Sequence, residues 1–417
     1  MKKYVLISVA LALIAILTAC NRKEKPVLSN EEMQFIKGQF DNALAVAVDP
    51  VKIPRTITKN GKLKTVDIYD WTSGFFAGNL WHMYELTNDE KWKKDAVKWT
   101  EILDSIQYFS NHHDVGFMIN SSYGNGLELT GNKEYEKVMV QAARSLIKRY
   151  SPVTKCIKSW NHRKAWDGKT DWYYPVIIDN MMNLELLFKA SLISENNTFR
   201  NIAVQHAMTT MKNHYRDDYS CYHVVDYDTL SGQVLDKATC QGFVDQSSWA
   251  RGQAWGLYGF TMCYRYTKDE RFLNFAENIA NYILTYPNLP KDMVPYWDYN
   301  AGDPGLKPEW KYDASKYPEI PRDVSAAAIT CSALFELSEY SKMNSEKYYI
   351  AASKILKSLT SPSYMAFSGN NKYFILNHSV GSIPHGFEID VPLVYADYYF
   401  LEAVIRKEHL IKAMHKN

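Results

Sequence analysis

The chain has 417 residues and a formal net charge of +2, with 46% hydrophobic and 23% charged residues. This is the composition of a soluble globular protein, long enough for two ordinary domains or one large closed fold. The small net charge lacks the basic signature of nucleic-acid binding, so no nucleic-acid partner is expected. The 30 tyrosines and 11 tryptophans are unusual. Flat rings with a polar edge suit the faces of sugars, although they also fill cores.

The N-terminus has the pattern of an export signal. Lys2 and Lys3 precede an apolar run from Val5 to Leu17, which is short for a membrane-spanning helix and ends in small residues. The sequence Leu17-Thr-Ala-Cys20 resembles the bacterial lipobox, which implies cleavage before Cys20 and lipidation of its thiol. We therefore predict a signal peptide over residues 1–19, a lipid-anchored tether over 20–30 and a folded domain over 31–417.

The residues after Cys20 predict where the protein is held. Asn21-Arg-Lys-Glu contains no acidic run, which favours a cell-envelope lipoprotein of the outer membrane that faces the periplasm. The lipid is then its only membrane contact.

Five more cysteines follow, Cys156, Cys221, Cys240, Cys263 and Cys331. Their spacing matches no metal-binding pattern, and we expect neither a metal nor a cofactor. Export permits disulfides, and Cys221 and Cys240 share one loop-like stretch, but buried free thiols fit at least as well.

Helical patterning runs along the whole domain with a weak internal repeat. A short polar turn is followed by an aromatic residue and, four residues later, by alanine on the same helix face. The copies are Trp92 and Ala96, Phe199 and Ala203, Phe272 and Ala276, and Tyr348 and Ala352, with a looser one at Tyr135 and Met139. A second set of helices, richer in small and apolar residues, is expected near 71–86, 119–129, 179–193, 248–266 and 323–340. Helices at 31–46 and 391–406 complete an all-α, single-domain (α/α)6 toroid of six hairpins, with the apolar set inside.

The long connections are expected at one end of this toroid. They cover about 47–70, 151–178, 216–247, 287–322 and 361–390, and each precedes an inner helix. Long loops in compact domains are usually functional. The inner helices point their N-termini to the same end, where their partial positive charge favours an anionic ligand.

Asp179 is the first candidate for chemistry. It follows Tyr174-Pro-Val-Ile-Ile and is followed after one residue by two methionines. Apolar surroundings disfavour a charged carboxylate and raise its pKa, as a general acid requires. Asp is also a preferred helix N-cap, so capping is the competing interpretation.

Asp114 is the second candidate, in the sequence His112-His113-Asp114-Val-Gly. His-His-Asp is compatible with a metal, but the chain lacks a helical His pair and its other histidines are scattered. A carboxylate before an inner helix suits substrate binding or acid–base chemistry better, and ordering of the loop is the simpler alternative.

Arg251 and Trp255 lie four residues apart on one helix face. Arg251 is suited to hold a carboxylate through two parallel hydrogen bonds, and Trp255 to stack on a sugar. The alternatives are that Arg251 pairs with Asp245 and that Trp255 belongs to the core. The glycines at 252, 256 and 259 permit close packing on the inner ring.

The segment from Gln241 to Trp255 resembles the signature of the unsaturated glucuronyl hydrolases, glycoside hydrolase family 88. Matches in the same order occur at Asp70-Trp-Thr-Ser-Gly-Phe75, His113-Asp-Val-Gly-Phe117, Ile178-Asp-Asn-Met-Met-Asn183 and the segment 391–402. This resemblance implies the toroid and an enzyme that acts on oligosaccharides ending in a 4,5-unsaturated uronic acid, the products of polysaccharide lyases. It implies hydration of the ring double bond, with a proton delivered to C4 and water to C5, so the carboxylate-distance rule of ordinary glycosidases does not apply.

The resemblance also assigns roles to residues. It implies that Asp179 is the general acid and helps to activate water, and that Asp114 holds the ring hydroxyls. His223 and Gln241 match positions near the uronate, Arg251 and Trp255 match subsite positions, and Trp71 and His113 match the walls. Ser379 and Ser382 match a region that recognises sulfate in some members, but His385 follows where sulfate-preferring members can have lysine. At Cys240 this chain departs from the family pattern, which often has a histidine at that position.

The leading hypothesis is therefore an exported unsaturated glucuronyl hydrolase for glycosaminoglycan-type lyase fragments. One alternative is the related pectin-directed activity on unsaturated galacturonyl units of rhamnogalacturonan. A second is a non-catalytic sugar-binding lipoprotein on the same scaffold.

Overall fold

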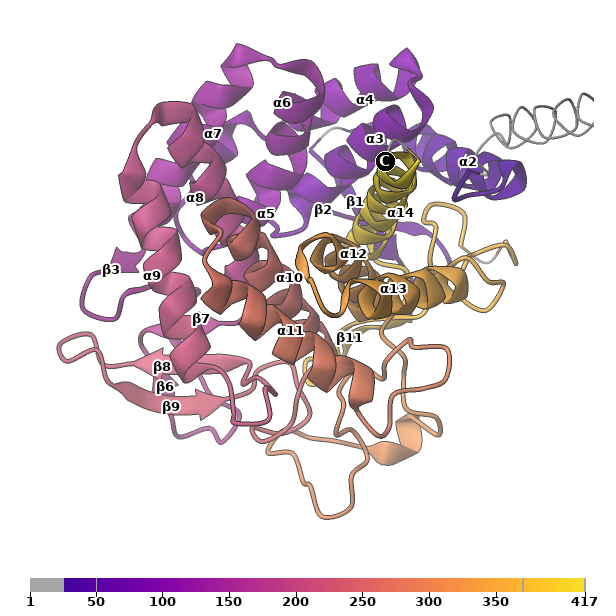
Figure 1. Cartoon of the computed structure of the whole chain (residues 1–417). Coiled ribbons are helices and arrows are strands. Elements are labelled where there is room, and N and C mark those ends of the chain that lie inside the picture. The colour runs from indigo at the N-terminus through magenta and orange to yellow at the C-terminus, as the bar shows by residue number, and fades with distance from the viewer. Residues whose placement is uncertain (1–25, 50, 370, 416–417) are drawn as a thin grey trace, which may run out of the picture.

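The computed structural model describes residues 26–49, 51–369 and 371–415, and the predicted signal peptide and Cys20 lie outside them. Two concentric sets of helices make up the fold (Figure 1). The outer set is α2 (Asn30–Val46), α4 (Glu90–Glu101), α7 (Lys133–Ile147), α9 (Asn197–Asn213), α11 (Glu270–Thr285) and α13 (Ser345–Leu359). The inner set is α3 (Ser73–Thr87), α5 (Val115–Ile119) with α6 (Asn125–Thr130), α8 (Asn180–Ser194), α10 (Ala250–Thr267), α12 (Val324–Tyr340) and α14 (Val394–Met414). The ring closes where α14 packs against α3. The predicted (α/α)6 toroid of a single domain is confirmed.

The two sets differ as their sequences predict. The outer helices α4, α9 and α11 start at Asp89, Asn196 and Asp269, whose side chains accept a hydrogen bond from the backbone two residues on. They bury one face, which carries the repeated aromatic residue and alanine. Inner helix α12 is instead buried from Val324 to Ser338, because neighbours surround it.

One inner helix differs from its prediction. The segment expected at 119–129 begins earlier, at Val115, and is divided by a π-helical turn, Asn120–Gly124. Within this turn the hydroxyl of Ser122 donates to the carbonyl of Met118, four residues back, at 2.6 Å. A side-chain donor that competes for a helix carbonyl loosens the regular ladder.

Close packing of inner helices depends on glycine, as predicted. A Cβ on Gly259 would lie 2.5 Å from Cβ of Met181 on α8. One on Gly256 would lie 1.9 Å from the hydroxyl of Tyr215. Neither position has room for a side chain, which explains glycine in a helix despite its poor propensity.

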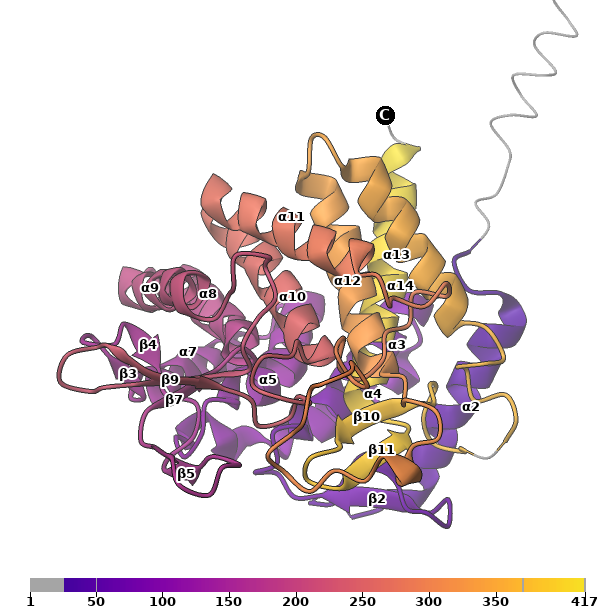
Figure 2. The same ribbon diagram turned by 90° about the horizontal axis from the view of Figure 1, so that it is seen from below.

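The long loops gather at one end, where the inner helices begin, and they contain short antiparallel sheets that the sequence did not predict (Figure 2). Four sheets have two strands each: β1 (Ile53–Ile57) with β2 (Leu63–Val66), β3 (Tyr150–Ser151) with β4 (Cys156–Ile157), β5 (Arg163–Lys164) with β6 (Asp171–Trp172), and β10 (Ser379–Ser382) with β11 (Phe387–Val391). In a fifth sheet β8 (Val224–Tyr227) is the central strand between β7 (Pro175–Ile177) and β9 (Val234–Ala238).

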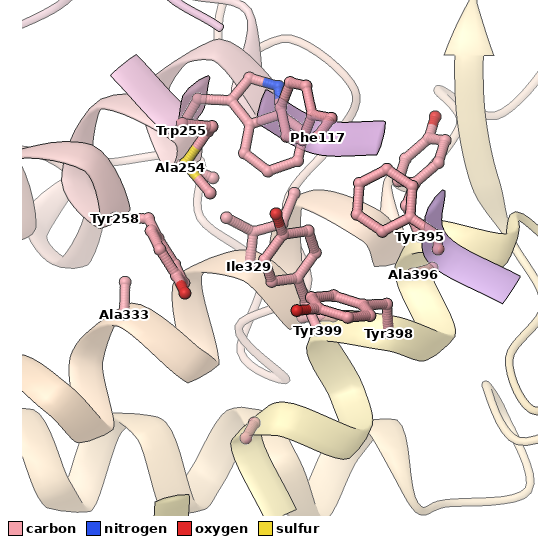
Figure 3. Close-up of a cluster of buried hydrophobic side chains, with 14 of the residues drawn as sticks. Phe117, Ala254, Trp255, Tyr258, Ile329, Ala333, Tyr395, Ala396, Tyr398 and Tyr399 are labelled. Atoms are coloured by element: carbon pink, nitrogen blue, oxygen red, sulfur yellow. The ribbon is translucent and has the colours of Figure 1, made fainter. Parts of the chain in front are cut away.

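Aromatic side chains from the inner helices form a buried cluster (Figure 3). The Trp255 ring lies 5.1 Å from Phe117 and 5.4 Å from Tyr399, and Tyr399 lies 5.6 Å from Tyr258, all between ring centroids.

The cysteines 156, 221, 240, 263 and 331 are buried free thiols. In the described part of the chain, no helix is long and apolar enough to cross a membrane.

Candidate active site

The predicted residues converge at the end where the inner helices begin. Asp114 and Asp179 immediately precede α5 and α8, and Arg251 and Trp255 lie in the first turns of α10. Trp71 precedes α3, and its ring packs 5.4 Å from that of Phe117 on α5. The other predicted residues lie on the loops: His223 before β8, Gln241 before α10, and Ser379 and Ser382 on β10.

Asp179 is buried, with 8% of its surface exposed. The interpretation of this residue as a helix cap is wrong, because its side chain makes no capping hydrogen bond to any described residue. Its Oδ2 is buried and also has no partner of hydrogen-bond geometry there. Burial raises the pKa of Asp179 to about 7, although Arg251 lowers it, and the charge of Asp114 adds to the rise. A carboxyl with this pKa holds a proton near neutral pH, as a general acid must.

His223 faces Asp179 as a neutral donor. Its Nδ1 accepts hydrogen bonds from the backbone N–H groups of Cys240, at 2.9 Å, and Gln241, at 3.1 Å. Burial, with Arg163 and Arg251, lowers the pKa of His223 far below its usual value, so the ring is neutral. Because Nδ1 accepts, Nε2 carries the hydrogen, and Nε2 lies 3.6 Å from Oδ2 of Asp179. Cys240 contributes to this arrangement through its backbone N–H.

Asp114 is held by the two histidines before it. His112 Nδ1 lies 3.0 Å from Oδ2 of Asp114, and His113 Nε2 lies 3.2 Å from Oδ1. The amide of Asn183 on α8 lies 3.4 Å from His113 Nδ1. Burial alone would raise the pKa of Asp114, but the two histidines outweigh it and lower the pKa. Asp114 is thus an oriented, charged acceptor, whereas His113 is fully buried and acts by positioning it.

Arg251 does not pair with Asp245. Its Nη1 donates to Oδ2 of Asp323 at 3.0 Å and to the carbonyl of Val380, and its Nη2 donates to the carbonyl of Gly381 at 2.7 Å. Because both Nη atoms are engaged, Arg251 cannot hold a ligand carboxylate through two parallel hydrogen bonds. Arg251 instead ties α10 to α12 and β10 and supplies positive charge near Asp179.

The position of Trp255 also does not allow the predicted stacking on a sugar. Its side chain is fully buried against Phe117 and Tyr399, so it has no free ring face. Its indole N–H is buried without a hydrogen bond of standard geometry to the described residues. It nevertheless lies close enough to Asp179 to lower the pKa of that carboxyl. Trp255 and His223 thus present two N–H donors to one carboxyl group.

The β10 edge forms another wall. Ser379 and Ser382 are buried, and the carbonyl of Gly381 between them accepts from the Gln241 amide at 3.4 Å. His385 Nδ1 lies 2.7 Å from the Ser382 hydroxyl, and Arg163 donates to His385 Nε2 at 2.6 Å. Since arginine only donates, His385 donates through Nδ1, and the Ser382 hydroxyl keeps its own hydrogen for another acceptor.

Sequence reasoning missed Arg163 and Asp323. Nothing in the sequence around Arg163 marks it, since its loop position depends on the short β5–β6 hairpin. Asp323 had a signal: like Asp179, it is an acid at the first position of a predicted inner helix. Unlike Asp179 it is a true cap, accepting from the backbone N–H groups of Ser325 and Ala326.

The chain matches the model of Glycosyl Hydrolase Family 88 over residues 52–302. The chain belongs to this family. It is therefore an enzyme, a glycoside hydrolase. An unsaturated glucuronyl hydrolase of Formosa agariphila is 43% identical over 99% of this chain and 100% of its own. An unsaturated chondroitin disaccharide hydrolase of Streptococcus agalactiae is 32% identical over 85% of each chain.

Solved structures agree with this placement in the family. The crystal structure of an unsaturated glucuronyl hydrolase specific for heparin superposes with a TM-score of 0.83 at 43% identity, covering 92% of this chain and 97% of that one. A mutant of the Streptococcus agalactiae unsaturated glucuronyl hydrolase, in complex with dGlcA-GalNAc6S, superposes with a TM-score of 0.74 at 29% identity, covering 92% of this chain and 93% of that one.

Proposed function

We propose that this chain is an exported unsaturated glucuronyl hydrolase, which hydrates the C4=C5 bond of the 4,5-unsaturated uronic acid at the non-reducing end of glycosaminoglycan-type oligosaccharides. The observation that carries the proposal is Asp179, a buried carboxyl whose pKa is raised to about 7 and which faces N–H donors instead of a cation of its own. Family membership supplies the reaction class in which such an acid is needed.

In the proposed reaction Asp179 donates its proton to C4 of the enol ether. Positive charge then develops at C5 and the ring oxygen, and water adds at C5 while the Asp179 carboxylate accepts the released proton. The N–H groups of His223 and Trp255 stabilise the carboxylate during the interval in which it is charged. The hemiketal opens and releases the uronate as a keto acid, so the glycosidic bond is not attacked directly.

The other residues position the substrate in this proposal. Asp114 is charged, oriented by His112 and His113, and partly exposed, which suits acceptance of hydrogen bonds from ring hydroxyls. Gln241 and the half-exposed Trp71 suit contacts around the uronate ring. Arg251 acts without direct contact, as a positive charge at the end of the toroid that binds an anion.

Arg163 supports a sulfated glycosaminoglycan fragment. Its guanidinium is partly exposed, lies 4.7 Å from the Trp160 ring centroid and reaches the Ser382 hydroxyl through His385. A cation and a free hydroxyl donor together suit a sulfate ester on the sugar next to the uronate. Pectin fragments lack such a group, so this observation favours glycosaminoglycans.

The deciding assay follows the loss of ultraviolet absorbance of the conjugated uronate with unsaturated heparin, chondroitin and pectin disaccharides. We expect turnover of the glycosaminoglycan substrates, faster when sulfated, and Arg163→Met should remove the advantage of sulfate. Preference for pectin disaccharides would favour the pectin-directed activity. Binding without any absorbance loss would identify a sugar-binding protein and contradict the proposal.

Export and lipidation are proposed from residues 1–20. The protein expressed with its natural N-terminus should be found in the bacterial outer-membrane fraction and carry lipid, and Cys20→Ser should release it from that fraction. Equal membrane recovery of both forms would contradict the lipid anchor.

A further inference from the structure

A cavity of about 260 Å³ lies at the end of the toroid opposite Asp179. Its walls come from the later turns of α3, α8, α10, α12 and α14 and from α6. Tyr258 and Tyr398 form its floor, and through Tyr399 they pack against Trp255 (Figure 3). This aromatic column separates the cavity from the active site, so the two are distinct.

The cavity is rich in negative charge. Its glutamates are Glu85, Glu128, Glu185, Glu336, Glu339 and Glu402. Its permanent cations are only Lys189, Arg265 and Arg406, and each is already paired. Arg265 donates to Glu336 at 2.6 Å and to Glu185 at 2.5 Å, Arg406 lies 2.9 Å from Glu336, and Lys189 lies 2.6 Å from Glu128. The C-termini of the inner helices add partial negative charge at this end.

Two of these carboxyl groups lack a strong partner. Glu85 has one ion-pair partner within the described chain, His409 at 3.5 Å, and Lys412 acts on it only through space. Burial, together with the charges of Glu128 and Glu402, raises the pKa of Glu85 to about 7. Glu339, at the rim, has no ion-pair partner in the described ranges, and burial and Glu336 raise its pKa as well. These two carboxyl groups therefore lack the positive charge that a neighbouring cation would supply.

Buried acceptors point to what would supply that charge. His82 lines the cavity, is 5% exposed, and has no hydrogen-bond partner for either ring nitrogen among the residues described. Burial and Arg406 lower the pKa of His82 to about 3, so the ring is neutral and offers a lone pair. Asn120 Oδ1, in the same wall, is a second buried acceptor left unpaired by the described chain. Unpaired buried polar atoms are costly, and a donor in the cavity would satisfy both.

The donor set does not suit a metal ion, because the described residues hold no group of three or more His, Cys, Asp or Glu side chains arranged to bind one. The volume exceeds that of a single ion or water, whose share of liquid volume is about 30 Å³. Leu129, Ile405 and the rings of Tyr340 and Tyr398 provide apolar contact beside the acceptors.

We propose that this cavity binds a small organic ammonium ion, whose N–H groups donate to Glu85, His82 and Asn120 while its carbon skeleton packs on the tyrosine rings. An amino sugar with a free amine and a short alkyl diamine share this chemistry. The site is independent of the catalytic function proposed above.

Titration calorimetry of the full-length protein tests the proposal, with glucosamine and putrescine as probes and N-acetylglucosamine as the matched neutral compound. We expect at least one amine to bind with a stoichiometry of one and the neutral sugar not to bind. Binding of glucosamine alone would identify an amino-sugar site, and binding of putrescine alone a diamine site.

Substitutions in the cavity test whether the amine binds there. Glu85→Gln should weaken amine affinity at least tenfold and leave turnover of the unsaturated disaccharide unchanged. His82→Phe, which keeps a ring and removes both nitrogens, should weaken it as well. Glu319→Gln, the same change at an exposed loop residue, is the matched control and should have no effect. The proposal is overturned if neither amine binds, if Glu85→Gln binds as tightly as the unaltered protein, or if N-acetylglucosamine binds equally well.

Discussion

Two carboxyl groups at helix α8 are buried to a similar extent, but their pKa values are shifted in opposite directions. Asp179 is 8% exposed and Glu185 is 6% exposed. Burial raises the pKa of Asp179 to about 7. At Glu185 burial acts in the same direction, but Arg265 and Lys189 outweigh it and lower the pKa to about 2. A committed cation, and not burial, decides which carboxyl keeps a proton.

The difference depends on where the neighbouring arginines direct their donors. Arg265 donates directly to Glu185 at 2.5 Å. Arg251 lies near Asp179, but its Nη atoms are bound by Asp323 and by the backbone of β10. It therefore lowers the pKa of Asp179 only through space, which is too weak to overcome burial. One end of the toroid keeps an acid ready to give up a proton, whereas Glu185 at the other end is neutralised by Arg265 and Lys189.

The largest effect is expected from Asp179→Asn. The amide keeps the shape of the side chain but has no proton to give, so turnover should fall by about 10²–10⁴-fold, the usual contribution of a general acid. Substrate binding and helical circular dichroism should remain. Turnover within a few-fold of normal would show that another group protonates C4.

The next largest effect is on stability and concerns Glu185. Glu185→Gln leaves Arg265 and Lys189 short of one buried partner, and we expect the free energy of unfolding to fall by about 3 kcal/mol. Arg265 retains Glu336, which limits the loss. Denaturant unfolding measures it, and turnover per folded molecule should be unchanged. A loss under about 0.5 kcal/mol, the scale of an ordinary surface substitution, would show that the ion pairs at this end do little.

The third effect is a pH-dependent change in stability at Asp179. Here the carboxyl group lowers the free energy of unfolding as pH rises, whereas Glu185 raises it. The folded-state pKa of Asp179 is raised above its value of 3.8, so its contribution to stability is present at low pH and is lost as pH rises toward 7. Between pH 5 and pH 8 the unaltered protein should lose roughly 2–3 kcal/mol relative to Asp179→Asn. Unfolding curves of both proteins across this range give the difference. A pH-independent difference would place the pKa of Asp179 near its ordinary value.

Much of this fold follows from local sequence. The inner helices predicted at 179–193 and 323–340 occur at Asn180–Ser194 and Val324–Tyr340, because polar turns and apolar runs mark their ends. The π-helical turn at Asn120–Gly124 was missed, since it depends on one hydroxyl competing for a carbonyl. The short sheets were missed because their strands have few residues and depend on pairing between loops.

The site was predictable as a set of residues but not as a set of partners. The acids before the inner helices indicated Asp114 and Asp179, and the resemblance gave them roles. The sequence did not reveal that Arg251 binds Asp323, which is far away along the chain, or that Trp255 is buried. Burial and the charge of Asp114 raise the pKa of Asp179, and the pKa stays raised because Arg251 is engaged elsewhere and lowers it only through space. Such pairings arise only when the ring of helices closes.

The most direct measurement is the titration of the Asp179 carboxyl itself. Difference infrared spectra of the unaltered protein and Asp179→Asn, recorded from pH 4 to pH 9, isolate the carboxyl band of this one residue. A buried acid without its own cation should lose that band with a midpoint near pH 7. A midpoint below pH 5 would mean that Asp179 is already charged at neutral pH and would contradict its assignment as the proton donor.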